Sequence, residues 1–127
     1  MASHILEHVW LGDVNDCPKF RGQRVNVMRQ YQSCPVVSCR SMDFLMGELP
    51  PDFEDHYVPR SHLENVAETI DGCADAPLLV HCLGGVERAP LSVAWWMKEK
   101  RGYSLDSAYA WVIARRPIVE DRRYWVR

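Results

Sequence analysis

The chain has 127 residues, and its 15 lysines and arginines nearly balance its 17 aspartates and glutamates, which leaves a formal net charge of -2 at pH 7. A chain of this length buries one hydrophobic core, so we expect a single domain over residues 1–127 that contains both the scaffold and the functional site. The interspersed charges exclude the basic surface of a non-specific nucleic-acid binder, and no signal-like start or run of about 18 apolar residues indicates a membrane partner. We therefore expect a monomeric cytoplasmic protein.

The first half of the chain favours short strands. Residues 4–11 alternate weakly between apolar and polar side chains and are followed by Gly12 and Asp13, which predicts a strand or hairpin that ends in a turn. Two runs with β-branched side chains, residues 24–28 and 35–39, predict two more strands.

From Ser61 the apolar side chains recur with helical spacing, and Ser61 and Glu64 have the spacing of a capping box. We predict a helix over residues 61–72. The fully apolar run 77–80 then predicts a strand that is buried on both of its faces.

Two further helices are expected after this strand. Residues 91–100 follow Pro90, which a first helical turn tolerates, and precede Gly102, which is typical of a helix end. A helix from Ser104 is expected to stop at Pro117.

Alternating strands and helices predict an α/β fold with a mostly parallel central sheet that is flanked by helices on both faces. Ligands of such sheets bind beyond the carboxyl ends of the strands. The segment that follows Val80 lies at such an end, so the functional site is expected there.

The five cysteines, which are Cys17, Cys34, Cys39, Cys73 and Cys82, include no C-x-x-C pair and none stands near a histidine with zinc-ligand spacing. This pattern predicts neither a disulfide scaffold nor a metal site, and nothing in the sequence points to a cofactor. At least three of these five thiols fit small, buried or half-buried side chains in a reducing compartment. Cys82 needs another explanation because of the segment that surrounds it.

Residues 81–88, with the sequence H-C-L-G-G-V-E-R, place Cys82 and Arg88 at the two ends of a five-residue loop that leads into a helix. Backbone N–H groups of such a loop converge on one point, and the helix N-terminus adds partial positive charge, so the loop can hold a phosphate dianion. The same field favours the thiolate of Cys82, and the guanidinium of Arg88 can grip two phosphoryl oxygens. Gly84 and Gly85 allow the backbone to turn inward.

This segment resembles the H-C-x-x-G-x-x-R signature of the cysteine-dependent protein tyrosine phosphatases, in particular the compact dual-specificity branch. The resemblance implies a protein tyrosine phosphatase-like fold, a nucleophilic Cys82 that forms a phosphocysteine, and Arg88 as the phosphate clamp. It also implies that the backbone of Leu83, Gly84, Gly85, Val86 and Glu87 binds phosphate and that His81 supports the loop from below. The implied substrate is a phosphorylated protein or peptide.

The resemblance also implies that a carboxylic acid on a neighbouring loop protonates the leaving group. Asp55 stands four residues before Pro59, as in the acid loop of the family, and is the preferred candidate. Asp52, in a Pro-Asp pair, is the alternative.

The variable loop positions are Leu83, Val86 and Glu87, with no lysine among them, which favours a singly phosphorylated side chain over a polyanionic substrate. Phosphotyrosine is expected, with phosphoserine and phosphothreonine as further substrates. One departure from the family pattern is Ala89, where the family carries serine or threonine. Two alternatives remain open: a catalytically weak phosphate-binding module, and a thiol redox enzyme such as an arsenate reductase.

Overall fold

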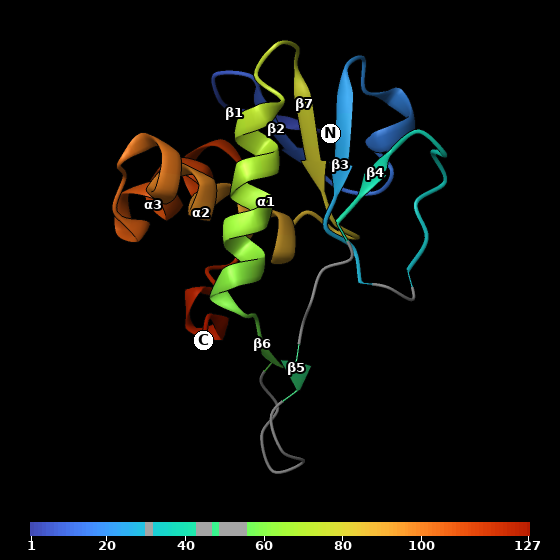
Figure 1. Cartoon of the computed structure of the whole chain (residues 1–127). Coiled ribbons are helices and arrows are strands. Elements are labelled where there is room, and N and C mark those ends of the chain that lie inside the picture. The colour runs from blue at the N-terminus through green and yellow to red at the C-terminus, as the bar shows by residue number, and fades with distance from the viewer. Residues whose placement is uncertain (30–31, 43–46, 49–55) are drawn as a thin grey trace.

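The computed structural model describes residues 1–29, 32–42, 47–48 and 56–127 (Figure 1). Its elements follow one another as β1 (Ser3–Leu6), β2 (Val9–Gly12), η1 (Cys17–Lys19), β3 (Gln23–Asn26), β4 (Arg40–Ser41), β5 (Gly47–Glu48), β6 (His56–Tyr57), α1 (Arg60–Gly72), β7 (Leu78–His81), α2 (Arg88–Arg101), α3 (Leu105–Arg115) and η2 (Arg123–Trp125).

The main sheet has five strands in the order β1-β2-β7-β3-β4. β1 and β2 form the expected antiparallel hairpin, and β2, β7, β3 and β4 run parallel. The strand predicted over residues 24–28 is β3. β7 is therefore the central strand, and the mostly parallel α/β sheet expected from the sequence is confirmed.

All four residues of β7 are buried, as the apolar run predicts. Leu78 and Val80 belong to the hydrophobic core, and because side chains alternate along a strand, Leu79 and His81 point to the opposite face of the sheet. Figure 1 shows α1, α2 and α3 together at one side of the sheet, with η1 beyond β3 on the other side. His81 thus faces the side of η1.

The three α-helices pack as a group, with α2 between α1 and α3. α1 buries Leu63, Val66 and Ile70 completely, and each side chain of this size contributes about 1.5 to 3 kcal/mol relative to an exposed one. α2 ends at Gly102, which has a φ of 74° that a left-handed C-cap requires. Ser104 caps α3, since its Oγ accepts from the Ser107 N–H at 3.1 Å.

Three boundaries differ from the sequence predictions. Residues 35–39, predicted as a strand, form a turn in which the Cys39 N–H donates to the Val36 carbonyl at 3.1 Å. The side chain of Val37 is fully exposed and packs against no sheet. α1 begins at Arg60, its N-cap is Pro59, and no side chain caps it, so the predicted capping box is wrong. α2 begins at Arg88, three residues before the predicted start.

Within the described ranges, no helix is long and apolar enough to cross a membrane.

Candidate functional site

The candidate site lies where the central strand ends. β7 ends at His81, Cys82 follows it directly, and α2 begins at Arg88. We call residues 82–88 the phosphate loop. A pocket of about 250 Å³ is lined by six of its seven residues, namely Cys82, Leu83, Gly84, Val86, Glu87 and Arg88. Cys82 is nearly buried, with 2% of its surface exposed. The structure therefore brings the thiol and the guanidinium-bearing residue of the predicted site to one pocket.

The carbonyl groups of the phosphate loop are bonded to the surrounding protein. The Leu83 carbonyl accepts from the backbone N–H of Val14 at 3.2 Å, and the Val86 carbonyl accepts from that of Glu120 at 2.9 Å. Among the residues that the structure describes, no group accepts a hydrogen bond from the backbone N–H of residues 83–87. The loop thus keeps its donors available at the N-terminus of α2, which is the arrangement that binds an anion.

Only one of the two glycines is required by the loop geometry. Gly85 has a φ of 65°, and a Cβ on it would lie 2.6 Å from the carbonyl oxygen of Gly12. A Cβ on Gly84 would meet nothing nearer than a methyl of Val86 at 3.7 Å. The need for glycine therefore arises at Gly85, from the close approach of β2 to the loop.

Two arginines from the C-terminal segment hold the loop in place, and the sequence analysis assigned them no role. Arg116 is buried, and its Nε donates to the Gly85 carbonyl at 3.0 Å. Arg122 donates from Nε to the Glu87 carboxylate at 2.8 Å. The basic pair before Pro117 is a sequence signal for Arg116, whereas nothing in the sequence distinguishes Arg122 from other surface arginines.

The Arg88 guanidinium donates a hydrogen bond to a neutral side chain. Its Nη1 donates to Oε1 of Gln32 at 2.5 Å, and the same oxygen accepts from the backbone N–H of Arg29 at 3.0 Å. Gln32 belongs to the connection between β3 and β4, and no motif or spacing in the sequence distinguishes it. A neutral amide oxygen is a weaker partner for guanidinium than a phosphate dianion, so a bound phosphate can replace it.

His81 is completely buried beneath the loop. Its Nδ1 lies 3.1 Å from the carbonyl oxygen of Cys82, and burial lowers the pKa of the ring, which favours the neutral form. A neutral imidazole bonded to a backbone carbonyl orients the chain at Cys82.

Both acid candidates, Asp55 and Asp52, lie outside the described residues. The chain after them is anchored, because Val58 donates to the Trp125 carbonyl at 2.7 Å and accepts from the Arg127 N–H at 3.0 Å. Ala89 is completely buried in the first turn of α2. In the described part of the chain, no side chain donates a hydrogen bond to the sulfur of Cys82.

No protein-family model matches the sequence, and no curated protein matches it. Solved structures do match the fold. Human tyrosine phosphatase-like serine/threonine/tyrosine-interacting protein has 18% identity and a TM-score of 0.76, with 98% of this chain and 89% of that chain covered. Human DUSP28 has 20% identity and a TM-score of 0.69, covering 98% and 86%. DUSP15 has 17% identity and a TM-score of 0.73, covering 98% and 81%. The chain has the fold of the compact dual-specificity phosphatases, as the resemblance implied.

Proposed function

We propose that this chain hydrolyses phosphate monoesters of tyrosine, and also of serine and threonine, in proteins or peptides. The observation that carries the proposal is the single pocket after β7, where the Cys82 thiol, Arg88 and the N-terminus of α2 meet. The unpaired N–H groups of residues 83–87 add to it, since a phosphoryl group needs several donors that are already oriented.

The reaction proceeds in two displacements. The Cys82 thiolate attacks phosphorus, an S–P bond forms, and the P–O bond to the tyrosine oxygen breaks, while Asp55 gives its proton to that oxygen. Water then attacks phosphorus, its proton passes to the Asp55 carboxylate, and the S–P bond breaks to release inorganic phosphate and the thiolate. Arg88 leaves Gln32 and binds two phosphoryl oxygens through both steps.

Substrates with one phosphate fit the charges at the pocket. Arg88 is the only cationic residue among those that line it in the described structure, and no lysine does. The nearby Arg122 is paired with both Glu87 and Glu120, so it is not free to neutralise a second phosphate. A polyanionic substrate would need more cations than this rim supplies.

Hydrolysis of p-nitrophenyl phosphate by the wild type and by Cys82→Ser tests the proposal. The serine variant should lose turnover by at least about a thousandfold while it still binds inorganic phosphate, because the loop donors and Arg88 are unchanged. Cys73→Ser is the matched control, since Cys73 lies at the end of α1, and should retain wild-type rates. A Cys82→Ser rate within tenfold of the wild type would exclude the covalent mechanism.

A catalytically weak phosphate-binding module is the second candidate. Ala89 favours it, since the family hydroxyl that assists thiolate departure is missing, and a structural neighbour is itself named phosphatase-like. This candidate predicts that wild-type protein binds a phosphotyrosine peptide and releases no phosphate. The arsenate reductase alternative has less support, because Cys34 and Cys39 contact Nε2 of His81 and, among the described residues, no cysteine thiol is hydrogen-bonded to the sulfur of Cys82.

A further inference from the structure

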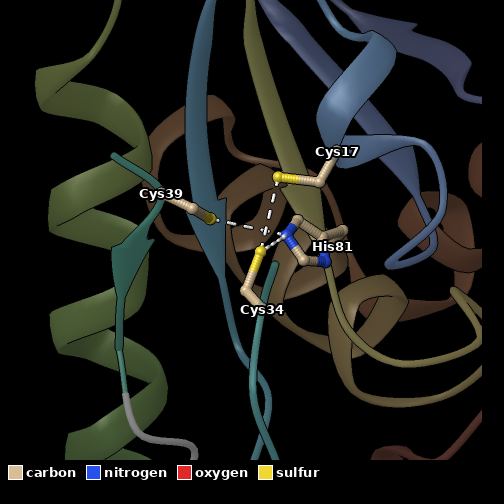
Figure 2. Close-up of side chains that lie close together, drawn as sticks. All are labelled: Cys17, Cys34, Cys39 and His81. Atoms are coloured by element: carbon tan, nitrogen blue, oxygen red, sulfur yellow. Dashed lines mark hydrogen bonds between the residues drawn. The ribbon is translucent and has the colours of Figure 1, made fainter. Parts of the chain in front are cut away.

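Three cysteines and the histidine beneath the phosphate loop form a compact group, which we call the sulfur cluster: Cys17, Cys34, Cys39 and His81. Their three sulfurs and one ring nitrogen all lie within 4.8 Å of one another. Figure 2 shows the side chains pointing toward a common centre. Cys17 and His81 are buried, and Cys34 and Cys39 are half-buried.

The fold assembles this cluster from distant parts of the sequence. Cys17 begins η1, Cys34 and Cys39 belong to the connection between β3 and β4, and His81 ends β7. All of them meet on the face of the sheet opposite α1, α2 and α3, because His81 points away from the hydrophobic core. Sulfur and nitrogen atoms thus gather on the face of the sheet where η1 lies.

The imidazole presents a lone pair to the sulfurs. Nδ1 lies 3.1 Å from the Cys82 carbonyl oxygen, which can only accept, so Nδ1 carries the proton and donates it. Nε2 is then the unprotonated nitrogen, and it lies 3.4 Å from the Cys39 sulfur and 3.7 Å from the Cys34 sulfur. A histidine that donates from one nitrogen to a backbone carbonyl while the other faces thiols has the orientation of a metal ligand.

A second layer of hydrogen bonds orients Cys39. Nδ2 of Asn26 donates to the Cys39 sulfur at 3.3 Å. The amide cannot be turned around, because its Oδ1 accepts from the Met28 N–H at 3.4 Å and from the Ser41 hydroxyl at 3.5 Å. A fixed donor aimed at sulfur stabilises a thiolate, the form that binds a metal.

Three of the six ligand-to-ligand distances in the sulfur cluster match those of a tetrahedral zinc site, and all six are within 4.8 Å. Zn–S bonds of about 2.3 Å and Zn–N bonds of about 2.0 Å require sulfur–sulfur and sulfur–nitrogen edges of about 3.5 to 3.8 Å. The Cys17 and Cys34 sulfurs are 3.6 Å apart, and the two sulfur–nitrogen contacts are 3.4 and 3.7 Å. We propose that Cys17, Cys34, Cys39 and His81 bind one Zn²⁺ ion in a closed, structural Cys3His site.

Binding converts three thiols into thiolates, so one Zn²⁺ enters as three protons leave, and the site carries a net charge of -1. Zinc would connect η1, the loop that carries Gln32 and β7, whose last residue, His81, directly precedes Cys82. The ion would thereby fix the support of the phosphate loop without taking part in phosphoryl transfer.

The site is tested by metal analysis of the full chain, purified without a polyhistidine tag and with a phosphine reductant. Mass spectrometric element analysis should find about one zinc per chain in the wild type. Cys82→Ser and Cys73→Ser should retain it, because neither residue belongs to the sulfur cluster. Cys34→Ser should lose most of it. Since zinc is read out in Cys82→Ser, this result does not depend on the proposed phosphatase activity.

Cobalt gives a readout that does not depend on a folded variant. Metal-free wild type titrated with Co²⁺ should develop the visible bands of a tetrahedral ion and thiolate charge-transfer absorption, and added Zn²⁺ should abolish both. A strong zinc chelator should lower the thermal midpoint of the wild type. The proposal is overturned if reduced wild type binds neither ion, or if Cys73→Ser loses zinc as Cys34→Ser does.

Discussion

The phosphate loop and the sulfur cluster meet at the peptide between His81 and Cys82, and they are built in opposite ways. The phosphate loop is seven consecutive residues whose carbonyls are bonded outward and whose donors remain available. The sulfur cluster takes one or two residues from each of three segments, two of them buried and two half-buried. Cysteines of one chain thus lie in two different environments: the Cys82 thiol lines a pocket, and the other three thiols pack beneath it around His81.

The first test of this difference between the phosphate loop and the sulfur cluster is Arg88→Lys, for which the largest effect on turnover is expected. A lysine keeps the charge but loses the two-pronged geometry, so we expect turnover to fall by about a thousandfold. Zinc content should stay at the wild-type value, since Arg88 contacts Gln32 and none of the cluster ligands. Both quantities are measured on one preparation, by steady-state hydrolysis and by metal analysis. Near-normal rates would show that Arg88 is not the residue that binds the phosphoryl oxygens.

Removal of the leaving-group acid should have the next largest effect. Asp55→Ala should lower turnover by about 10² to 10³ with poor leaving groups, and much less when the leaving group is already acidic. The basic limb of the pH–rate profile should flatten, because the protonated acid whose loss creates that limb is gone. Asp52→Ala is the control, and if it gives this pattern while Asp55→Ala does not, the acid is Asp52.

The two glycines of the phosphate loop offer a matched pair. Gly85→Ala places a Cβ against the Gly12 carbonyl at a positive φ, so we expect about 1 to 3 kcal/mol of lost stability and a turnover loss of about tenfold or more. Gly84→Ala has space for its methyl and should change the turnover by less than about threefold. Chemical denaturation and steady-state kinetics distinguish the two, and equal effects would contradict the loop geometry.

Ala89→Ser should increase turnover. The added hydroxyl can stabilise the departing Cys82 thiolate by about 1.5 to 3 kcal/mol, which limits the gain to about ten- to a hundredfold. The wild type should show a burst of leaving group before a slower steady state, and the serine variant should show a smaller burst. A linear wild-type time course together with no gain in Ala89→Ser would show that phosphocysteine breakdown is not the slow step.

Asn26→Ala should leave turnover nearly unchanged, within about threefold, while it weakens the cluster. The amide donor to the Cys39 sulfur is lost, and the loss of such a group around a metal site typically lowers affinity by about 10- to 100-fold. Competition for zinc against a chromogenic chelator measures the change. A wild-type zinc affinity in Asn26→Ala would mean that the amide does not support the site.

The sequence predictions are confirmed where one short segment contains the whole pattern on which the prediction depends. The hairpin, the buried strand β7, the end of α2 at Gly102 and the Cys82–Arg88 spacing all depend on neighbours within a few residues. Predictions failed where distant contacts decide. Residues 35–39 include β-branched side chains that favour a strand, yet the chain turns there and Cys39 contacts His81. Helix α1 begins at Arg60, although Ser61 is the residue type that favours an N-cap.

The sequence by itself determined the α/β order of elements, the position of the phosphate loop and the residue types that a phosphate binder needs. These features depend on residues that are close together in the sequence, as in a loop between a strand and a helix. Tertiary structure decided which groups hold that loop. Arg116 and Gln32 reach it from 31 and 56 positions away along the chain. The same holds for the sulfur cluster, where 47 positions separate Cys34 from His81. Sequence spacing cannot reveal such a cluster, because only the sheet brings β7 beside β3 and places η1 and the loop after β3 on one face.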